Sequence, residues 1–345
     1  MRIFSDPHLG LKRKVHTTVN SRKALAERLH TAAFKACFMC KPNSVVCAGD
    51  LFDTYSNKED EIISAAAIAN YCDVVLAGNH DLLNQADSVG SLQVVDRLLS
   101  DVDVIQCTSF DEPTVTAGEL EDMRLAFIPH HATQDLFNEA IELAVEMGEE
   151  ENFRGIFLHC NYENDMAVGS DTSLNLTKEQ AWALLTVSDY VFLGHEHHPR
   201  ELLDGRLVIL GNVHPTSFGD ISDKYYWDLY PDRLEKTLCW EEGEKAVVME
   251  FDAEYPAPPP SNQYDFITVT GEITADHGAG LAQYIQDLWH HCDPLMVRNN
   301  VTVKMIAAQE IAAVDVENLE QVISTALEGT ELNDVWNQYR GQIKC

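Results

Sequence analysis

The chain has 345 residues, of which 45% are hydrophobic and 23% are charged. This composition excludes a disordered or fibrous protein and is sufficient for a large buried core. Lysine and arginine number 24 against 56 aspartate and glutamate residues, so the formal net charge is −32. A chain this acidic is expected to repel nucleic acid over most of its surface.

The N-terminal segment departs from this average. Residues 1–41 hold nine lysine or arginine residues and only two acidic ones. The sequence contains no apolar run long enough for a membrane span, and its first residues lack the apolar stretch of a signal peptide. Nine cysteines, an odd number, lie mostly in apolar runs and indicate reduced, buried thiols. We therefore expect a cytoplasmic protein that does not associate with membranes.

Short apolar runs typical of β-strands alternate with segments of helical periodicity over the first two thirds of the chain. This alternation predicts a layered α/β fold in which helices cover the faces of sheets. The predicted strands are 1–4, 44–48, 73–77, 103–106, 124–129, 155–159, 189–194 and 206–211, and the predicted helices are 21–40, 59–71, 91–99, 133–148 and 177–186.

The pattern changes after residue 212, where aromatic and turn-rich sequence is followed by a proline cluster at 255–262. Prolines in this density favour an extended linker. Beyond it, FITVTGEI, GLAQYIQDLWHHC and NVTVKMIA predict a small βαβ unit. We therefore divide the chain into a large domain, 1–255, a small α+β domain, 256–308, and a helical tail, 309–345.

Polar side chains that can bind metals follow five of the predicted strands, at the edge where open α/β sheets place their ligand sites. Each motif alone is a weak signal, but five of them in this order exclude a purely structural role. Imidazoles, an amide oxygen and a carboxylate able to bridge two ions are the ligands that a pair of divalent cations needs. The residues are Asp6 and His8, then Asp50 and Asp53, then Asn79, His80 and Asp81, then His159, and last His195 and His197.

The motifs DPH, GDLFD, GNHD, the isolated His159 and GHEH closely resemble those of the calcineurin-like metallophosphoesterases. Within that family, SDPHLG, AGDLFD and LGNVHPTSFGD are similar to the SbcD-type DNA repair nucleases and their phage recombination counterparts. The resemblance implies two sheets flanked by helices, with a small C-terminal capping domain that binds DNA and a helical tail.

The resemblance also implies a role for each site residue. One cation would be held by Asp6, His8, Asp50 and His197, and the other by Asp50, Asn79, His159 and His195. His80 would contact the scissile phosphate and stabilise or protonate the leaving group, and Asp81 would orient His80. Manganese is the expected metal, although these ligands also suit magnesium, zinc and iron. Some relatives carry histidine where this chain has Asp53, which leaves the balance of exonuclease and endonuclease action open.

The implied function is a metal-dependent DNA nuclease that works in repair or recombination with an SbcC-like ATPase of the SMC family, docked on the C-terminal tail. Lys12, Arg13 and Lys14 form the densest basic run of the chain and follow the first metal motif, so they are candidate contacts for DNA phosphates. The alternative for this run is a solvated loop.

Other functions stay open at this stage. A small-molecule phosphodiesterase or phosphatase of the same family would use the same ligands, and a silent scaffold could keep the fold. Protein phosphatases usually show GNHE where this chain has GNHD, and loss of activity typically removes ligands that are all present here. The pair Cys37 and Cys40 fits a helix better than a metal or redox site. The oligomeric state, a homodimer included, is not fixed by the sequence.

Overall fold

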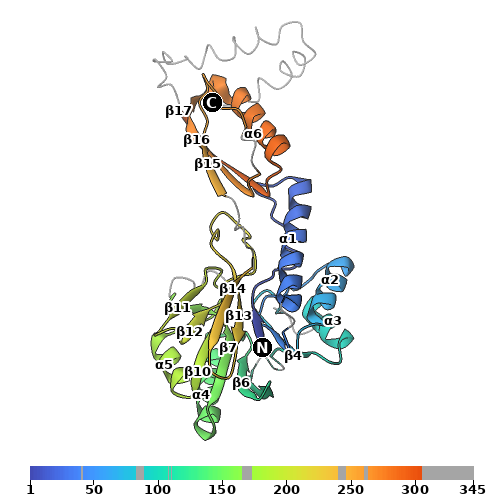
Figure 1. Ribbon diagram of the computed structural model, residues 1–345, viewed down its shortest axis with the longest axis vertical. Helices are drawn as coiled ribbons and strands as arrows, with labels where there is room; N and C mark the ends of the chain where they lie inside the picture. The colour runs from blue at the N-terminus through green and yellow to red at the C-terminus, as the bar shows by residue number, and fades with distance from the viewer. Residues whose placement is uncertain are drawn as a thin grey trace, which may run out of the picture.

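The structure is a computed structural model, and it describes residues 1–39, 42–82, 89–107, 109, 111–164, 173–239, 246–259 and 263–304. Two six-stranded sheets with helices on their outer faces form the larger part of the molecule, and a smaller three-stranded unit lies at its far end (Figure 1). The predicted α/β architecture of two sheets flanked by helices is confirmed.

The first sheet has the order β14-β13-β1-β2-β3-β4. Strands β1 to β4 are parallel, and the hairpin of β13 and β14 continues the sheet antiparallel to β1. All four carboxyl ends of the parallel strands therefore lie at one edge. The bounds are β1 Arg2–Phe4, β2 Val45–Cys47, β3 Val74–Leu76, β4 Asp103–Ile105, β13 Tyr225–Leu229 and β14 Leu234–Leu238.

The second sheet has the order β11-β12-β10-β7-β6-β5 and repeats this plan. Its four central strands are parallel, and the edge strands β5 and β11 are antiparallel to their neighbours. The bounds are β5 Thr116–Leu120, β6 Met123–Ile128, β7 Phe153–His159, β10 Ser188–Gly194, β11 Arg200–Leu202 and β12 Leu207–Ile209. A separate short ladder joins β8 Asn161–Tyr162 to β9 Asn175–Leu176.

Alternation of side chains along the strands divides the interior into layers. In β1, Ile3 faces the second sheet, whereas Phe4 faces the helices that cover the first sheet. Between the sheets, Phe157 stacks on Phe127 and Phe192 with ring centroids 5.0 and 4.8 Å apart. Burial of one such side chain contributes about 1.5–3 kcal/mol, so this layer holds the two sheets, and with them their strand ends, firmly together.

Helices α1, α2 and α3 cover the first sheet, and α4 and α5 cover the second. Thr18 caps α1 by accepting a hydrogen bond from the backbone N–H of Ser21. Cys37 packs inside the core under α1, and Cys40 lies outside the described residues. The bounds are α1 Val19–Phe38, α2 Glu59–Ala69, α3 Ser91–Leu98, α4 Gln134–Glu150 and α5 Lys178–Thr186.

The small unit consists of a parallel sheet in the order β15-β16-β17 and helix α6. The predicted βαβ unit is confirmed as β16, α6 and β17. Strand β15 precedes the proline cluster, so the predicted domain boundary at 255 divides this sheet, because a linker does not determine which sheet the strand before it joins. The bounds are β15 Ala246–Glu250, β16 Phe266–Thr274, α6 Gly278–Cys292 and β17 Met296–Lys304, with a 3-10 turn at Ala275–His277. The predicted tail, 309–345, lies outside the described residues.

The small unit contacts the N-terminal half of α1 and the loop that precedes this helix. Leu25 and Leu29 of α1 share an apolar cluster with Phe266 and Met296. The backbone N–H of Val297 also donates to the carbonyl of His16, with a distance of 3.0 Å. The basic N-terminal segment thus connects the larger body with the small unit.

Candidate metal centre

The predicted site residues meet where the carboxyl ends of the two parallel sheets face each other. The first sheet supplies Asp6 and His8 after β1, Asp50 after β2, and Asn79 after β3, while the second supplies His159 at the end of β7 and His195 and His197 after β10. Within the part of the chain that the structure describes, three groups of three such residues bring their ligand atoms within 4.8 Å of one another. The first group is Asp6 with His8 and His197, and the second is Asp50 with His159 and His195. A third, His8 with Asp53 and His80, shares His8 with the first group.

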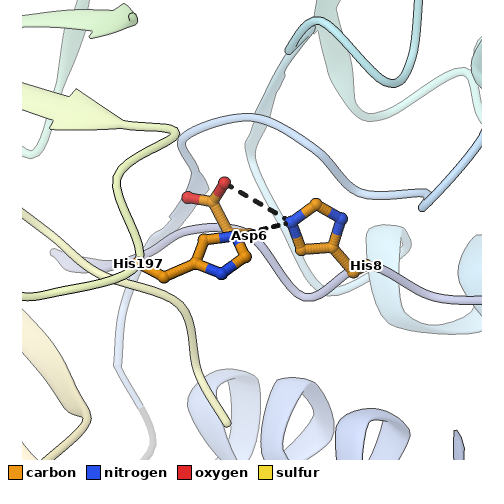
Figure 2. Close-up of side chains that lie close together, drawn as sticks. All are labelled: Asp6, His8 and His197. Atoms are coloured by element: carbon orange, nitrogen blue, oxygen red, sulfur yellow. Dashed lines mark hydrogen bonds and ion pairs between the residues drawn. The ribbon is translucent and has the colours of Figure 1, made fainter. Parts of the chain in front are cut away.

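In the first group, Asp6, His8 and His197 point toward one another (Figure 2). The Nε2 atoms of His8 and His197 lie 3.0 Å apart, and Nε2 of His8 lies 3.8 Å from Oδ1 of Asp6. Asp6 is fully buried, while the side chain of His197 is 24% exposed. The group is therefore closed on the protein side and open toward solvent on one side.

In the second group, Nε2 of His159 lies 3.2 Å from Oδ2 of Asp50. Nδ1 of His195 lies 2.9 Å from the amide oxygen of Asn79, which brings the neutral oxygen donor into this group. The same Oδ2 of Asp50 lies 3.8 Å from Nε2 of His8 in the first group. One carboxylate oxygen thus faces both groups, as a bridging ligand must.

The backbone at this edge adopts conformations that are costly for residues with side chains. Asp6, His8, Asp50 and His195 all have positive φ, at 54°, 44°, 48° and 86°. Such residues persist where the surrounding structure holds them, and they cluster at functional sites. Gly78 lets the loop after β3 approach the side chain of Asp50 closely, because a Cβ atom at Gly78 would lie 2.1 Å from Oδ1 of Asp50.

The protonation of the imidazoles tests whether cations fit here. Nδ1 of His197 lies 3.1 Å from Oδ2 of Asp220, and Nδ1 of His8 lies 3.4 Å from Oδ1 of Asp53. The carboxylate of Asp220 accepts a hydrogen bond, so we assign the proton of the His197 ring to Nδ1, whereas the buried Nδ1 of His8 has no hydrogen-bond partner. The Nε2 lone pair of His197 then faces Nε2 of His8 across 3.0 Å, where His8 can donate a proton and a cation bound by both nitrogens could replace that proton. The residues of this group fit a metal ion.

The second group leads to the same conclusion. Nδ1 of His159 lies 3.0 Å from the carbonyl oxygen of Ala48, which only accepts, so the other nitrogen, Nε2, faces the carboxylates. Burial lowers the pKa of His159, but attraction to Asp50 and Asp6 raises the pKa more strongly, to about 10. Burial raises the pKa of Asp50, yet His159 and then His8 bring the pKa of this carboxyl well below its usual range. A proton occupies this position in the metal-free protein, and a divalent cation can replace it.

His80 lies beside the first group and is partly exposed. Its ring meets the ring of His8 edge-on, with centroids 5.1 Å apart, and its Nδ1 lies 2.5 Å from the carbonyl oxygen of Asp53. The expectation that Asp81 orients His80 is not what the structure shows. The Asp81 carboxylate instead accepts backbone N–H groups of Leu51, Phe52 and Gly78. Asp81 therefore fixes the loops that carry Asp50 and Asn79. The contact to Nδ1 of His80 that was predicted for Asp81 is made by the carbonyl oxygen of Asp53 instead.

Two carboxylates that were not predicted to be supports lie beside metal-facing histidines. Asp53 faces His8, and Asp220 faces His197. Asp220 lies in the GNVHPTSFGD segment, whose presence after a strand was the available signal. His130 and His131 are buried, and Nδ1 of His130 faces the carbonyl oxygen of His159 at 3.4 Å.

The basic loop emerges beside the centre and is exposed. Nε of Arg13 donates to the carbonyl of Thr216, at 3.3 Å, and Lys12 forms an exposed ion pair with Glu61. Lys14 is exposed. The loop is thus exposed to solvent and begins four residues after His8.

Comparisons with known proteins agree with this centre. A model of the calcineurin-like phosphoesterase family matches residues 2–199, more than half of the chain, and the chain belongs to this family. The protein is therefore a metal-dependent phosphoester hydrolase, of a family that typically binds two divalent cations. Its two groups of ligand atoms are compatible with such a pair.

Among solved structures, the chain is similar to a conserved uncharacterized protein of Streptococcus pneumoniae described as a predicted phosphoesterase. The two are 14% identical, with a TM-score of 0.27, and the match covers 69% of this chain and 95% of that one. A likeness this low supports no conclusion about function. A search of curated proteins finds no match. None of the described helices combines the length and apolar character needed to cross a membrane.

Manganese binding should release a proton from His159. With a pKa of about 10, this imidazole is protonated at pH 7.5 in the metal-free protein, and a cation must displace that proton. The affinity for manganese should therefore increase as the pH is raised toward about 10. Titration calorimetry in buffers of different ionisation enthalpy should give about one released proton from this residue. The release should disappear, with most of the binding, in His159→Gln and persist in the exposed control His291→Gln. Full binding to wild type without proton release would contradict the assignment.

Proposed function

We propose that this phosphoester hydrolase is a DNA nuclease, with exonuclease or endonuclease action or both. The observation that carries the proposal is the exposed loop of Lys12, Arg13 and Lys14 beside the metal centre. Outside residues 1–41 the chain has 15 basic and 54 acidic residues, so a polyanion would be repelled by most of the surface. A phosphate backbone is attracted by local cations, and here they adjoin the ligands.

The residues of the centre suit hydrolysis of a phosphodiester. When bound, a pair of divalent cations polarises the phosphoryl group and lowers the pKa of water, which supplies the nucleophile at neutral pH. Oδ2 of Asp50 faces both groups of ligands, through His8 in the first and His159 in the second. His80 presents Nε2 opposite the Nδ1 that faces the Asp53 carbonyl, and with a second proton on Nε2 the ring would donate to a phosphate oxygen or pass that proton to the leaving group.

Two other functions are distinguished from a DNA nuclease by the experiments described below. A small-molecule phosphodiesterase would use the same centre but would not need the basic loop. A silent scaffold would not need the ligands, yet all seven predicted ligands lie at the centre, four of them in costly backbone conformations. Both features favour an active enzyme.

We also propose that the chain works with an SMC-like ATPase, with residues 309–343 as the docking segment. These residues carry apolar side chains at helical spacing and one tryptophan, Trp336, which suits binding in a groove of a partner. Duplex DNA must be opened or fed to a centre that acts on one phosphate at a time, and an ATPase supplies that work.

His80 should be needed for turnover but not for metal binding. We expect His80→Ala to bind manganese as wild type does and to lose about 100- to 1,000-fold in rate, because one preorganised donor to the transition state is gone. Asp50→Ala should lose metal and activity together. The exposed His290→Ala is the control and should match wild type in both measurements. If folded His80→Ala fails to bind two manganese ions in calorimetry, the role given to His80 is wrong.

The basic loop should matter for DNA and not for a small substrate. Because Arg13 holds the Thr216 carbonyl, the sharpest variant changes only the flanking lysines, Lys12→Gln with Lys14→Gln. We expect weaker DNA binding, with the slope of affinity against salt reduced by about one unit for each lost phosphate contact. Hydrolysis of an aryl phosphodiester should stay at the wild-type rate, since the metal ligands are unchanged.

The matched control for this experiment removes the same charge elsewhere, through Lys178→Gln with Lys236→Gln, two exposed lysines outside residues 1–41. It should leave DNA binding nearly unchanged. Equal losses of DNA binding in both double variants would show that net charge alone, and not the position of the lysines, causes the effect. Rapid hydrolysis of the aryl substrate by wild type with no cleavage of linear DNA in manganese would favour the small-molecule phosphodiesterase.

Truncation after Ala308 should remove the partner and leave the enzyme. The described contacts between the small unit and α1 all come from residues before 305, so the shortened chain keeps them. We expect unchanged cleavage of single-stranded DNA, loss of co-purification with the ATPase, and loss of ATP-dependent duplex cleavage. A melting temperature lowered by many degrees would instead show that the tail belongs to the core of the small unit.

A further inference from the structure

The segment 216–221 lies between the metal centre and the small unit and contacts both. We propose that this segment is a positioning element. Through Asp220 it holds the metal-facing ring of His197, and through Phe218 it makes that hold depend on the docking of the small unit.

On the side of the metal centre, the segment is ordered around the Asp220 carboxylate. Asp220 is buried, and its Oδ2 faces Nδ1 of His197 at 3.1 Å. The carboxylate also accepts from Nδ2 of Asn212 at 2.9 Å, from the backbone N–H and hydroxyl of Thr216, and from the backbone N–H of Ser217. A carboxylate with this many donors is fixed in position, and it fixes the tautomer and the direction of the His197 ring.

On the side of the small unit, Phe218 is held by aromatic and cationic groups. Its ring meets Phe266 of β16 edge-on, with centroids 5.7 Å apart, and the guanidinium of Arg298 of β17 lies 4.5 Å from the ring centre. His16, from the loop before α1, meets the same ring at 5.9 Å. Phe218 belongs to the apolar cluster through which the small unit contacts α1.

The two sides are joined by a very short stretch of chain. Phe218 and Asp220 are separated only by Gly219, whose carbonyl oxygen faces Nε2 of His198 at 2.8 Å, and His198 is the residue that follows His197. The buried Lys224 donates to the carbonyl of His197 at 2.8 Å. A shift of Phe218 would therefore be passed directly to the residues that orient His197.

The consequence is specific to one of the two groups of ligands. Asp220 supports His197, which belongs with Asp6 and His8. In the second group, His159 is oriented by the Ala48 carbonyl and His195 faces Asn79, and neither contact involves segment 216–221. Loosening the segment should weaken one cation site and spare the other.

The test measures manganese binding alone, so it does not depend on DNA being the substrate. In wild type we expect two sites, seen by titration calorimetry and by the electron paramagnetic resonance signal of a coupled manganese pair. Asp220→Asn should weaken one site about 10- to 100-fold. Phe218→Ala should weaken the same site about 2- to 30-fold, the usual range for a residue that acts through another, and reduce the coupled signal. The second site should keep its wild-type affinity in both variants.

The double variant separates coupling from independent damage. If Phe218 acts through Asp220, the double variant binds no more weakly than Asp220→Asn alone. Leu288→Ala is the matched control, because Leu288 is fully buried in the core of the small unit and is not part of the cluster around Phe218. It should lower the melting temperature without changing either manganese site.

Some outcomes would overturn the proposal. Unchanged manganese affinity in folded Phe218→Ala, additive losses in the double variant, or equal weakening of both sites would each do so. If Leu288→Ala weakens manganese binding at the same site equally, the effect of Phe218→Ala comes from a general loss of stability, and the proposal is wrong. If Phe218→Ala fails to fold, Phe218→Leu keeps most of the apolar volume while removing the ring that Phe266 and Arg298 contact, and the same predictions apply to it.

Discussion

The approach of His8 and His197 to within 3.0 Å is the contact on which the rest of the structure depends. The Asp220 carboxylate accepts from Nδ1 of His197, so the Nε2 lone pair of His197 faces Nε2 of His8. A cation bound by both nitrogens could take the place of the proton between them. The fold must therefore supply enough stability elsewhere to hold both rings in this position.

The packing of the two sheets supplies that stability. Stacked phenylalanines between the sheets, with Phe157 at the centre, fix the strand ends of β1 to β3 against those of β7 and β10. The chain then turns sharply at Asp6, Asp50 and His195, where a positive φ is tolerated because neighbouring backbone hydrogen bonds hold it. The His195 backbone N–H donates to the carboxylate of Asp6, which ties the second sheet to the first at the metal centre itself. Rigidity and catalytic geometry have the same origin here.

The fold and the ligands could be predicted because both follow from local pattern. Runs such as SVVCA are typical of buried strands, and the carboxyl ends of parallel strands share an edge, so Asp50 and Asn79 were expected to be neighbours. Supports that join distant elements were beyond this reasoning. The partner of His197 is Asp220, reached by a turn whose shape depends on hydrogen bonds from Thr216 and Ser217 to the Asp220 carboxylate. Asp81 was predicted to orient its neighbour His80, but the Asp81 carboxylate accepts from the backbone of Leu51 and Phe52. Strand β15 pairs across the proline cluster, and proline content does not reveal pairing.

The central claim is that these residues hold two cations in separate but bridged sites. Anomalous X-ray scattering from crystals soaked in manganese chloride tests it most directly, because each bound ion gives its own peak. The account predicts two peaks, one among Asp6, His8 and His197 and one among Asn79, His159 and His195, with Asp50 between them. A single peak, or a peak between Asp53 and His80 with the second group empty, would contradict it.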